Sequence, residues 1–158
     1  MLIVHKIMII KKITEIEIKN AAKIAQNILG QSEDDAISYL SETIKMKNGA
    51  VFIAKNEYNI LGFIRGTYTE WNMIGNIGLI ATTEAARGKG IGKALISAFE
   101  KWAREKGVRK IFVDTCEENK NAMIFYIKCG YIPEMYMSDY YADGSAGINF
   151  GKQINPSK

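Results

Sequence analysis

The sequence predicts an α/β fold built around a mixed sheet. Strand-like and helical segments alternate along the 158 residues in the order β-α-α-β-β-β-α-β-α-β-β, without repeats, linkers or low-complexity stretches. A long amphipathic segment at residues 90–106 stands between two apolar strands, and such a strand-helix-strand unit makes a right-handed crossover with two parallel strands. Hydrophobic residues make up 47% of the chain, which suffices for one core. We therefore expect a single domain over residues 1–158.

The first half supplies short apolar strands and two helices. The strands are expected at residues 7–12, 50–55, 60–69 and 76–82, the middle two as an antiparallel hairpin around a turn at residues 56–59. Helices are expected at residues 18–29 and 34–46, where apolar residues recur every three or four positions. Gly30 ends the first helix, and Ser32 or Glu33 lies near the start of the second. We expect residues 1–6 to form a flexible extension, with Met8 as an alternative start.

The second half follows the same logic. In the helix at residues 90–106, which Gly107 caps, the expected buried face is Ile91, Leu95, Ala98, Phe99, Trp102 and Ala103, and the expected solvent face is Glu100, Lys101, Arg104 and Glu105. The run at residues 110–115 is nearly all apolar, which predicts a strand covered on both faces. A short helix at residues 121–129 ends at Gly130. Two strands at residues 131–141 and 146–153 turn at residues 142–145, and residues 154–158 form a tail.

Composition excludes several classes of function. The net charge is +4 and the lysines are scattered, so no dense basic face points to nucleic acid. No apolar run has the length of a membrane span. Cys116 and Cys129 form no C-x-x-C pair, and a core of this size needs no disulfide, so we expect reduced thiols and a cytoplasmic protein. His5 is the only histidine, and we expect no metal.

The segment with the clearest chemistry is residues 87–92, Arg-Gly-Lys-Gly-Ile-Gly, between a strand and the long helix. Glycines at a helix start expose backbone N–H groups to an anion, and Lys89 and Lys93 add positive charge. A P-loop would need Ser or Thr where Ala94 stands, and a dinucleotide-binding fingerprint would need a third glycine at Lys93. Taken alone, the segment is also compatible with a tight turn whose glycines serve packing.

Two segments together resemble the GNAT superfamily of N-acetyltransferases. Arg87, Gly90 and Gly92 match its R-x-x-G-x-G pyrophosphate signature, and residues 119–131 resemble its N-x-x-A-x-x-x-Y-x-x-x-G-[F/Y] segment. The resemblance implies the GNAT fold, a central mixed sheet of six to seven strands flanked by four helices, with strands splayed at the cofactor site. It also implies acetyl-CoA as co-substrate.

The resemblance further implies roles for individual residues. The cofactor-binding residues would be Ile80, Thr82, Arg87, Gly88, Lys89, Gly90, Ile91, Gly92, Lys93, Asn119, Ala122 and Tyr126. The backbones of Ile80 and Thr82 would hold the acetyl carbonyl and the pantetheine arm. Asn119 would hydrogen-bond the pantetheine or phosphate region, with Asn121 as the alternative. Tyr126 would protonate the departing thiolate, since a phenol is a weak acid suited to a thiol; its structural alternative is a core aromatic residue.

The base is left open by the sequence. Many histone-type members of the family place a glutamate eleven residues ahead of the signature arginine, where this chain has Asn76. Glu70 and Glu84 are the nearest carboxylates. Either a carboxylate acts through water, or the amine arrives neutral.

The acceptor is also open. Asp139, Tyr140 and Tyr141 resemble the Tyr-Tyr segment of N-terminal peptide acetyltransferases and would bind substrate, which favours a protein or peptide amine that attacks directly in a ternary complex. A polyamine or aminoglycoside-like amine is the alternative acceptor. A non-catalytic acyl-CoA sensor is the alternative of another class, and a homodimer is left open. The acidic residues at 33–35 are better explained as a helix start.

Overall fold

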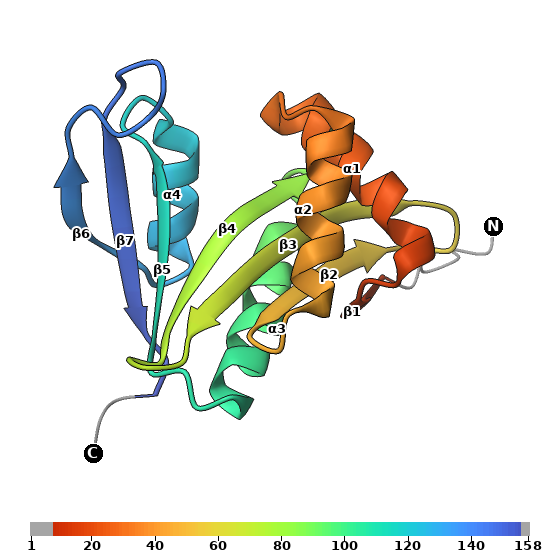
Figure 1. Ribbon diagram of the computed structural model, residues 1–158. Coiled ribbons are helices and arrows are strands. Elements are labelled where there is room, and N and C mark those ends of the chain that lie inside the picture. Colours follow the sequence, from red (N-terminus) through yellow and green to blue (C-terminus); the bar gives the residue numbers. More distant parts are fainter. Residues whose placement is uncertain (1–7, 156–158) are drawn as a thin grey trace. The chain divides into compact units, whose positions relative to one another are not determined.

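A computed structural model describes residues 8–155 of the chain. The predictions for the extension at residues 1–6, for His5 and for the last residues of the tail lie outside this range. Eleven regular helices and strands follow each other in the predicted order, with one short 3₁₀ turn at Glu84–Ala86 added before the long helix. The seven strands form one mixed sheet in the order β1-β2-β3-β4-β5-β7-β6 (Figure 1). The predicted fold class is confirmed.

The element boundaries lie close to the predicted ones. The strands are β1 (Ile9–Lys12), β2 (Gly49–Lys55), β3 (Ile60–Thr69), β4 (Ile74–Thr82), β5 (Lys110–Cys116), β6 (Ile132–Met137) and β7 (Gly147–Gln153). The helices are α1 (Glu15–Leu29), α2 (Glu33–Lys45), α3 (Ile91–Glu105) and α4 (Lys120–Lys128). By its internal contacts the described chain divides into two compact units, a first unit of residues 8–66 with 79–99 and a second unit of residues 67–78 with 100–155. The prediction of a single domain stays a prediction.

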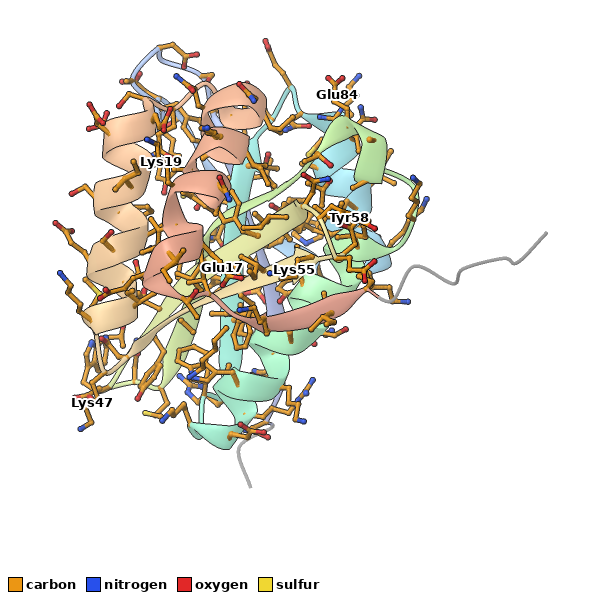
Figure 2. All side chains as sticks on the ribbon, turned by 90° about the vertical axis from the view of Figure 1, so that its right-hand side faces the viewer. Glu17, Lys19, Lys47, Lys55, Tyr58 and Glu84 are labelled. Carbon is orange, nitrogen blue, oxygen red and sulfur yellow. The ribbon has the colours of Figure 1, made fainter. Side chains whose placement is uncertain are left out.

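In the first unit, α1 and α2 cover one face of the strands (Figure 1). Their apolar stripes meet the inward side chains of β2 and β3 in a core that includes Ala21, Ala25, Leu40, Ile53 and Phe63. β1 pairs antiparallel with β2. The rim of this layer is charged, because Glu17 on α1 accepts hydrogen bonds from Lys55 on β2 at 3.0 Å and from Lys11 at 2.8 Å (Figure 2).

In the second unit, β5 lies between β4 and β7. It pairs with β4 in parallel, over Ile74–Ile77 against Lys110–Val113, as the crossover rule predicts. This pairing ends at Ile77, although β4 runs on to Thr82. On its other side β5 pairs antiparallel with β7 along its whole length, and β6 pairs with β7 as the outer strand.

Helix boundaries follow from local residue chemistry. Thr14 and Glu17 form a capping box at the start of α1, and Ser32 accepts a hydrogen bond from the Asp35 N–H at the start of α2. The predicted stop at Gly30 is confirmed, since this residue has φ +69° and its N–H bonds the Gln26 carbonyl. α1 begins three residues before the predicted start because the capping box, and not the apolar stripe, sets its first turn.

Three sequence predictions about burial and length are wrong. Glu100 was expected in solvent, but it is 4% exposed because its carboxylate has cationic partners within the second unit. β5 is not buried on both faces: Ile111, Val113 and Thr115 are buried, while the residues between them are half-buried. The strand predicted for residues 131–141 spans only Ile132–Met137, because Asp139 adopts φ +51° and starts a turn.

Candidate active site

The glycine loop leads from β4 into α3. Gly88 and Gly90 have φ +71° and +75°, a conformation that glycine adopts without strain. A Cβ atom at either position would meet no other atom within 4 Å, so the space beside both residues is open. Lys89 Nζ donates to the Ala85 carbonyl oxygen at 2.7 Å and ties the loop to the 3₁₀ turn before it. Arg87 is exposed. The loop therefore offers bare backbone and an exposed guanidinium to a ligand.

The start of α3 differs from the other helix starts. α1, α2 and α4 each begin behind a side chain with a capping oxygen, from Thr14, Ser32 and Asn119. α3 follows Gly90, which has no side chain, and its first turn contains no acidic residue. The first N–H groups of a helix have no intrahelical partner and lie at the positive end of the helix dipole. Such an end is suited to a phosphate.

The last residues of β4 present backbone groups on one side. The Thr83 N–H donates to the Leu61 carbonyl oxygen at 2.9 Å. The backbone N–H and C=O groups of odd-numbered residues in this segment therefore point toward β3. Because successive backbone groups alternate along a strand, the N–H and C=O of Ile80 and Thr82 point away from β3. Both residues are half-buried. This orientation suits the predicted role of Ile80 and Thr82 in pairing with an extended ligand.

Tyr126 lies on α4 in the second unit and is 6% exposed. Its ring contacts the rings of Phe125, Tyr131 and Phe150, with centroids 5.4, 6.3 and 5.8 Å away. Burial raises the pKa of Tyr126 well above its usual value, and the nearby charge of Asp114 adds to the effect. The phenol is consequently fixed in position and keeps its proton at every physiological pH.

Asn119 has a structural task as well. Its Oδ1 accepts a hydrogen bond from the Ala122 N–H at 3.1 Å and so caps α4. This contact explains the spacing of Asn and Ala in the sequence segment by helix capping. The Asn119 side chain is exposed, as is Asn121, the alternative residue. Contact of either side chain with a cofactor stays a prediction.

The predicted acceptor residues lie in the loop after β6. Tyr141 Oη donates to Asp114 Oδ2 at 2.8 Å, and the rings of Tyr140 and Tyr141 meet edge to face at 5.0 Å. Burial and the hydrogen bond to Asp114 raise the pKa of Tyr141, and the Asp114 charge raises that of Tyr140. Asp139, in contrast, occupies a left-handed turn position, so its first role is in the loop.

Asp114 is a candidate functional residue that the sequence analysis does not single out. It lies on β5, opposite Asn149 on β7, and its charge acts on Tyr126, Tyr140 and Tyr141. Among the described residues, it has no cationic partner. The sequence signal is a single carboxylate that directly follows the apolar run at residues 111–113 within a strand. A half-buried carboxylate in a strand without a cationic partner among the described residues is a candidate for function.

Two positions considered from the sequence for a base, Asn76 and Glu84, lie outside β5. Asn76 is exposed on β4, and Glu84 is exposed at the start of the 3₁₀ turn (Figure 2).

Cys116 is half-buried and Cys129 is buried, and neither forms a disulfide. Within residues 8–155, His, Cys, Asp and Glu side chains form no group of three that could hold a metal ion. Nor does this part of the chain contain a helix long and apolar enough to cross a membrane.

Comparison with known proteins identifies the family of the chain. Residues 17–131 match the model of the acetyltransferase (GNAT) family. The aminoglycoside N(6')-acetyltransferase type 1 of Stenotrophomonas maltophilia is 30% identical over 122 residues, 71% of this chain and 80% of that protein. The N-alpha-acetyltransferase of Sulfurisphaera tokodaii is 28% identical over 85% of this chain and 90% of that protein. Against the streptothricin acetyltransferase of Escherichia coli, the match spans only 53% of that protein's length.

Solved structures agree with the sequence matches. Ard1 from Thermoplasma volcanium superposes with a TM-score of 0.82 at 22% identity, over 94% of this chain and 99% of that chain, which shows a shared fold. A Bacillus anthracis protein in complex with acetyl coenzyme A is 28% identical, with a TM-score of 0.66 over 72% of this chain and 66% of that chain. The glycine loop, the element order and the family match lead to one conclusion: the chain belongs to the acetyltransferase (GNAT) family.

Proposed function

We propose that this enzyme transfers the acetyl group of acetyl coenzyme A to a primary amine, which attacks the thioester directly while both substrates are bound. The observation that carries the proposal is the start of α3, where open space beside Gly88 and Gly90 meets a helix end without a capping side chain. Bare N–H groups beside Arg87 and Lys93 suit the pyrophosphate of coenzyme A. The related acetyltransferase from Bacillus anthracis holds acetyl coenzyme A, which supports this choice.

Each part of the site has a task in this reaction. Arg87, Lys89 and Lys93, with the backbone of residues 88–92, would hold the phosphates. The outward backbone groups of Ile80 and Thr82 would align the pantetheine arm and polarise the acetyl carbonyl by hydrogen bonding. Acetyl coenzyme A supplies a thioester whose carbonyl carbon an amine can attack.

Asp114 and Tyr126 would handle the protons. As the C–N bond forms, the nitrogen becomes acidic, and the Asp114 carboxylate would accept its proton. As the C–S bond breaks, the Tyr126 hydroxyl would donate its proton to the sulfur. Burial of Tyr126 favours this role, because the same apolar surroundings that keep the phenol neutral also disfavour a thiolate. A carboxylate base and a buried phenolic acid thus divide the two proton transfers.

The names of the relatives give streptothricin and aminoglycosides as acceptors, and one relative is named as an N-alpha-acetyltransferase. The Tyr140–Tyr141 pair beside Asp114 favours a peptide α-amine for this chain.

We also propose a cytoplasmic setting, since the two cysteines form no disulfide.

An acceptor screen tests the proposal. The enzyme is incubated with acetyl coenzyme A and, separately, with peptides, polyamines and aminoglycosides, and release of free thiol is followed. We expect thiol release stimulated by an amine, with the acetylated amine detected by mass spectrometry. Thiol release that no amine stimulates, together with no acetylated product in any of the three classes, would contradict the proposed function.

A further inference from the structure

The strand β7 has an unusual face in the second unit. Alternate residues of a strand share a face, so Gly147, Asn149 and Gly151 lie on the same side of β7. A Cβ atom on Gly147 would come within 2.8 Å of the Tyr140 ring, and one on Gly151 would overlap the carboxylate of Glu134. The two glycines therefore let neighbouring side chains lie flat on the backbone. Asn149 is the side chain that stands between them.

Asn149 lies directly opposite Asp114 on β5 and Met135 on β6. Side chains of directly opposed residues are about 5 Å apart at Cβ, so the amide and the carboxylate are neighbours. The Asn149 Oδ1 atom is buried and accepts no hydrogen bond within the described chain. Leaving a buried carbonyl oxygen without a donor costs stability, and native proteins keep such groups for a reason. A ligand that brings an N–H group would complete this site.

We propose that Asn149 and Asp114 together bind the amino end of a peptide acceptor, with the α-amine at Asp114 and the first peptide N–H donated to Asn149 Oδ1. This inference rests on the proposed function and names its substrate class. It makes Asn149 a residue that selects the acceptor, while the chemistry stays with Asp114 and Tyr126.

The donor set favours a peptide over a polyamine. In a peptide, the α-nitrogen and the next backbone nitrogen are about 3 Å apart, and only the first is charged. One carboxylate beside one neutral carbonyl matches that pattern. A polyamine brings a second ammonium group that would need a second carboxylate, but Glu134 on this face is paired with Lys110 at 2.6 Å. Asp143 in the adjacent loop accepts hydrogen bonds from the Ser145 N–H and hydroxyl.

Access to Asn149 Oδ1 requires a side chain to move. Met135 is its neighbour on β6 and is 49% exposed. Methionine has three rotatable bonds and few rotamer constraints, so it can swing aside when a ligand enters. Tyr140, lying on Gly147, would then border the peptide backbone.

The test combines one variant with one altered substrate. Asn149→Leu keeps the size of the side chain and removes the acceptor oxygen. Tetra-alanine amide is the peptide probe, and its analogue with an ester in place of the first amide lacks the proposed N–H donor. For the wild type we expect KM for the ester analogue to be roughly threefold to tenfold higher than for the peptide. For Asn149→Leu we expect KM for the peptide to rise by the same factor and the two substrates to become equal, because both changes remove one contact.

Two controls separate binding from folding. The Tm of Asn149→Leu should stay equal or rise, since an unpaired buried oxygen is removed, and KM for acetyl coenzyme A should not change. Gln153→Leu makes the same chemical change at the exposed end of β7, and it should leave every KM value unaltered.

Several outcomes would overturn the inference. One is equal wild-type KM values for the peptide and its ester analogue, a comparison that holds even if the Leu variant fails to fold. Another is a wild-type enzyme that acetylates spermidine but not tetra-alanine amide, which would leave the acetyltransferase function intact and remove the peptide assignment. Absence of acetylation of every amine would instead contradict the proposed function itself.

Discussion

Lys152 Nζ lies 2.8 and 3.0 Å from the two carboxylate oxygens of Glu100 and donates to both. The Glu100 side chain is 5% exposed and also accepts hydrogen bonds from Tyr131 Oη at 3.1 Å and from Arg104 at 3.2 Å. Lys152 donates in addition to the Cys129 carbonyl oxygen. One buried carboxylate thus connects α3, β7 and the end of α4, and its charge is tolerated only because these donors surround it.

Removing the cation should therefore destabilise the fold. We expect Lys152→Met to lower the free energy of unfolding by about 3 kcal/mol, because a buried carboxylate loses its main partner. Urea denaturation measures the change. The control is Lys101→Met, which changes an exposed lysine next to Glu100 on α3. It should change the free energy of unfolding by less than about 0.5 kcal/mol. The double change Glu100→Leu with Lys152→Met should recover most of the loss, and a double variant as unstable as Lys152→Met would contradict the pairing argument.

Glu17 makes stability depend on acid. Burial by itself raises the pKa of this carboxyl, but hydrogen bonds from Lys11, Lys55 and Thr14 outweigh it and lower the pKa from 4.5 to about 2. The folded value is below the unfolded one, so the stabilisation is complete above pH 4.5 and is lost as pH falls toward 2. We expect it to be about 2 kcal/mol, because the partly exposed lysines are screened.

The Glu17 prediction is checked by Tm measured between pH 5 and pH 2. Glu17→Gln should flatten this part of the curve and lower Tm at pH 6. Glu15→Gln, an exposed residue of the same helical turn, should do neither. A Glu17→Gln curve that parallels the wild type would show that other carboxyl groups cause the acid loss.

Gly90 should be required for binding acetyl coenzyme A. The wild type should gain about 2.7 kcal/mol of stability at a ligand concentration of 100 Kd, read as a rise in Tm. Gly90→Ala places a methyl group in the open space of the loop and should abolish the rise. Gly30→Ala is a matched control, since Gly30 has a similar φ of +69° and equally open space but lies at the end of α1. Each variant should lose about 1–2 kcal/mol through backbone strain; a normal ligand-induced rise in Gly90→Ala would remove the loop from the binding site.

Tyr126→Phe should separate chemistry from packing. It keeps the ring contacts and deletes the proton donor, so kcat should fall on the order of 10²-fold while KM for acetyl coenzyme A changes little. Tyr131→Phe deletes another buried hydroxyl of the same aromatic cluster. It should cost about 1.5–3 kcal/mol of stability, because this hydroxyl donates to the buried Glu100 carboxylate, and it should leave kcat nearly unchanged. Equal kcat values for Tyr126→Phe and the wild type would return Tyr126 to the core as a packing residue.

Asp114 and the acceptor together should set the pH profile. For a peptide α-amine, with an ordinary pKa of about 8, the rate should climb through neutral pH and level off near that value. Asp114→Asn should lower kcat on the order of 10²-fold, whereas Asp143→Asn in the adjacent exposed loop should not. A wild-type rate that stays flat down to pH 6 would mean that another group deprotonates the amine. Glu70→Gln and Glu84→Gln would then be the variants to measure.

The fold class, the element order and the glycine loop could be predicted from the sequence. These depend on patterns within about fifteen residues: apolar periodicity, glycines at helix ends such as Gly30, and the spacing of Arg87, Gly90 and Gly92. Local sterics and helix capping fix such features, so they can be predicted without the tertiary structure. The parallel pairing of β4 with β5 could also be predicted from the sequence, because a helix between two strands of one sheet usually joins them in parallel.

The tertiary structure alone decided which charges are buried and which polar groups meet. Periodicity assigned Glu100 to solvent, but Lys152, 52 residues later, pairs with it once β7 lies beside β5. Likewise Asp114 meets Tyr141, 27 residues away, and Asn149 on the facing strand. The register of non-adjacent strands sets these encounters, and no local propensity encodes it. The residues proposed to bind the acceptor could therefore not be grouped from the sequence, because β5, β7 and the loop after β6 come together only in the fold.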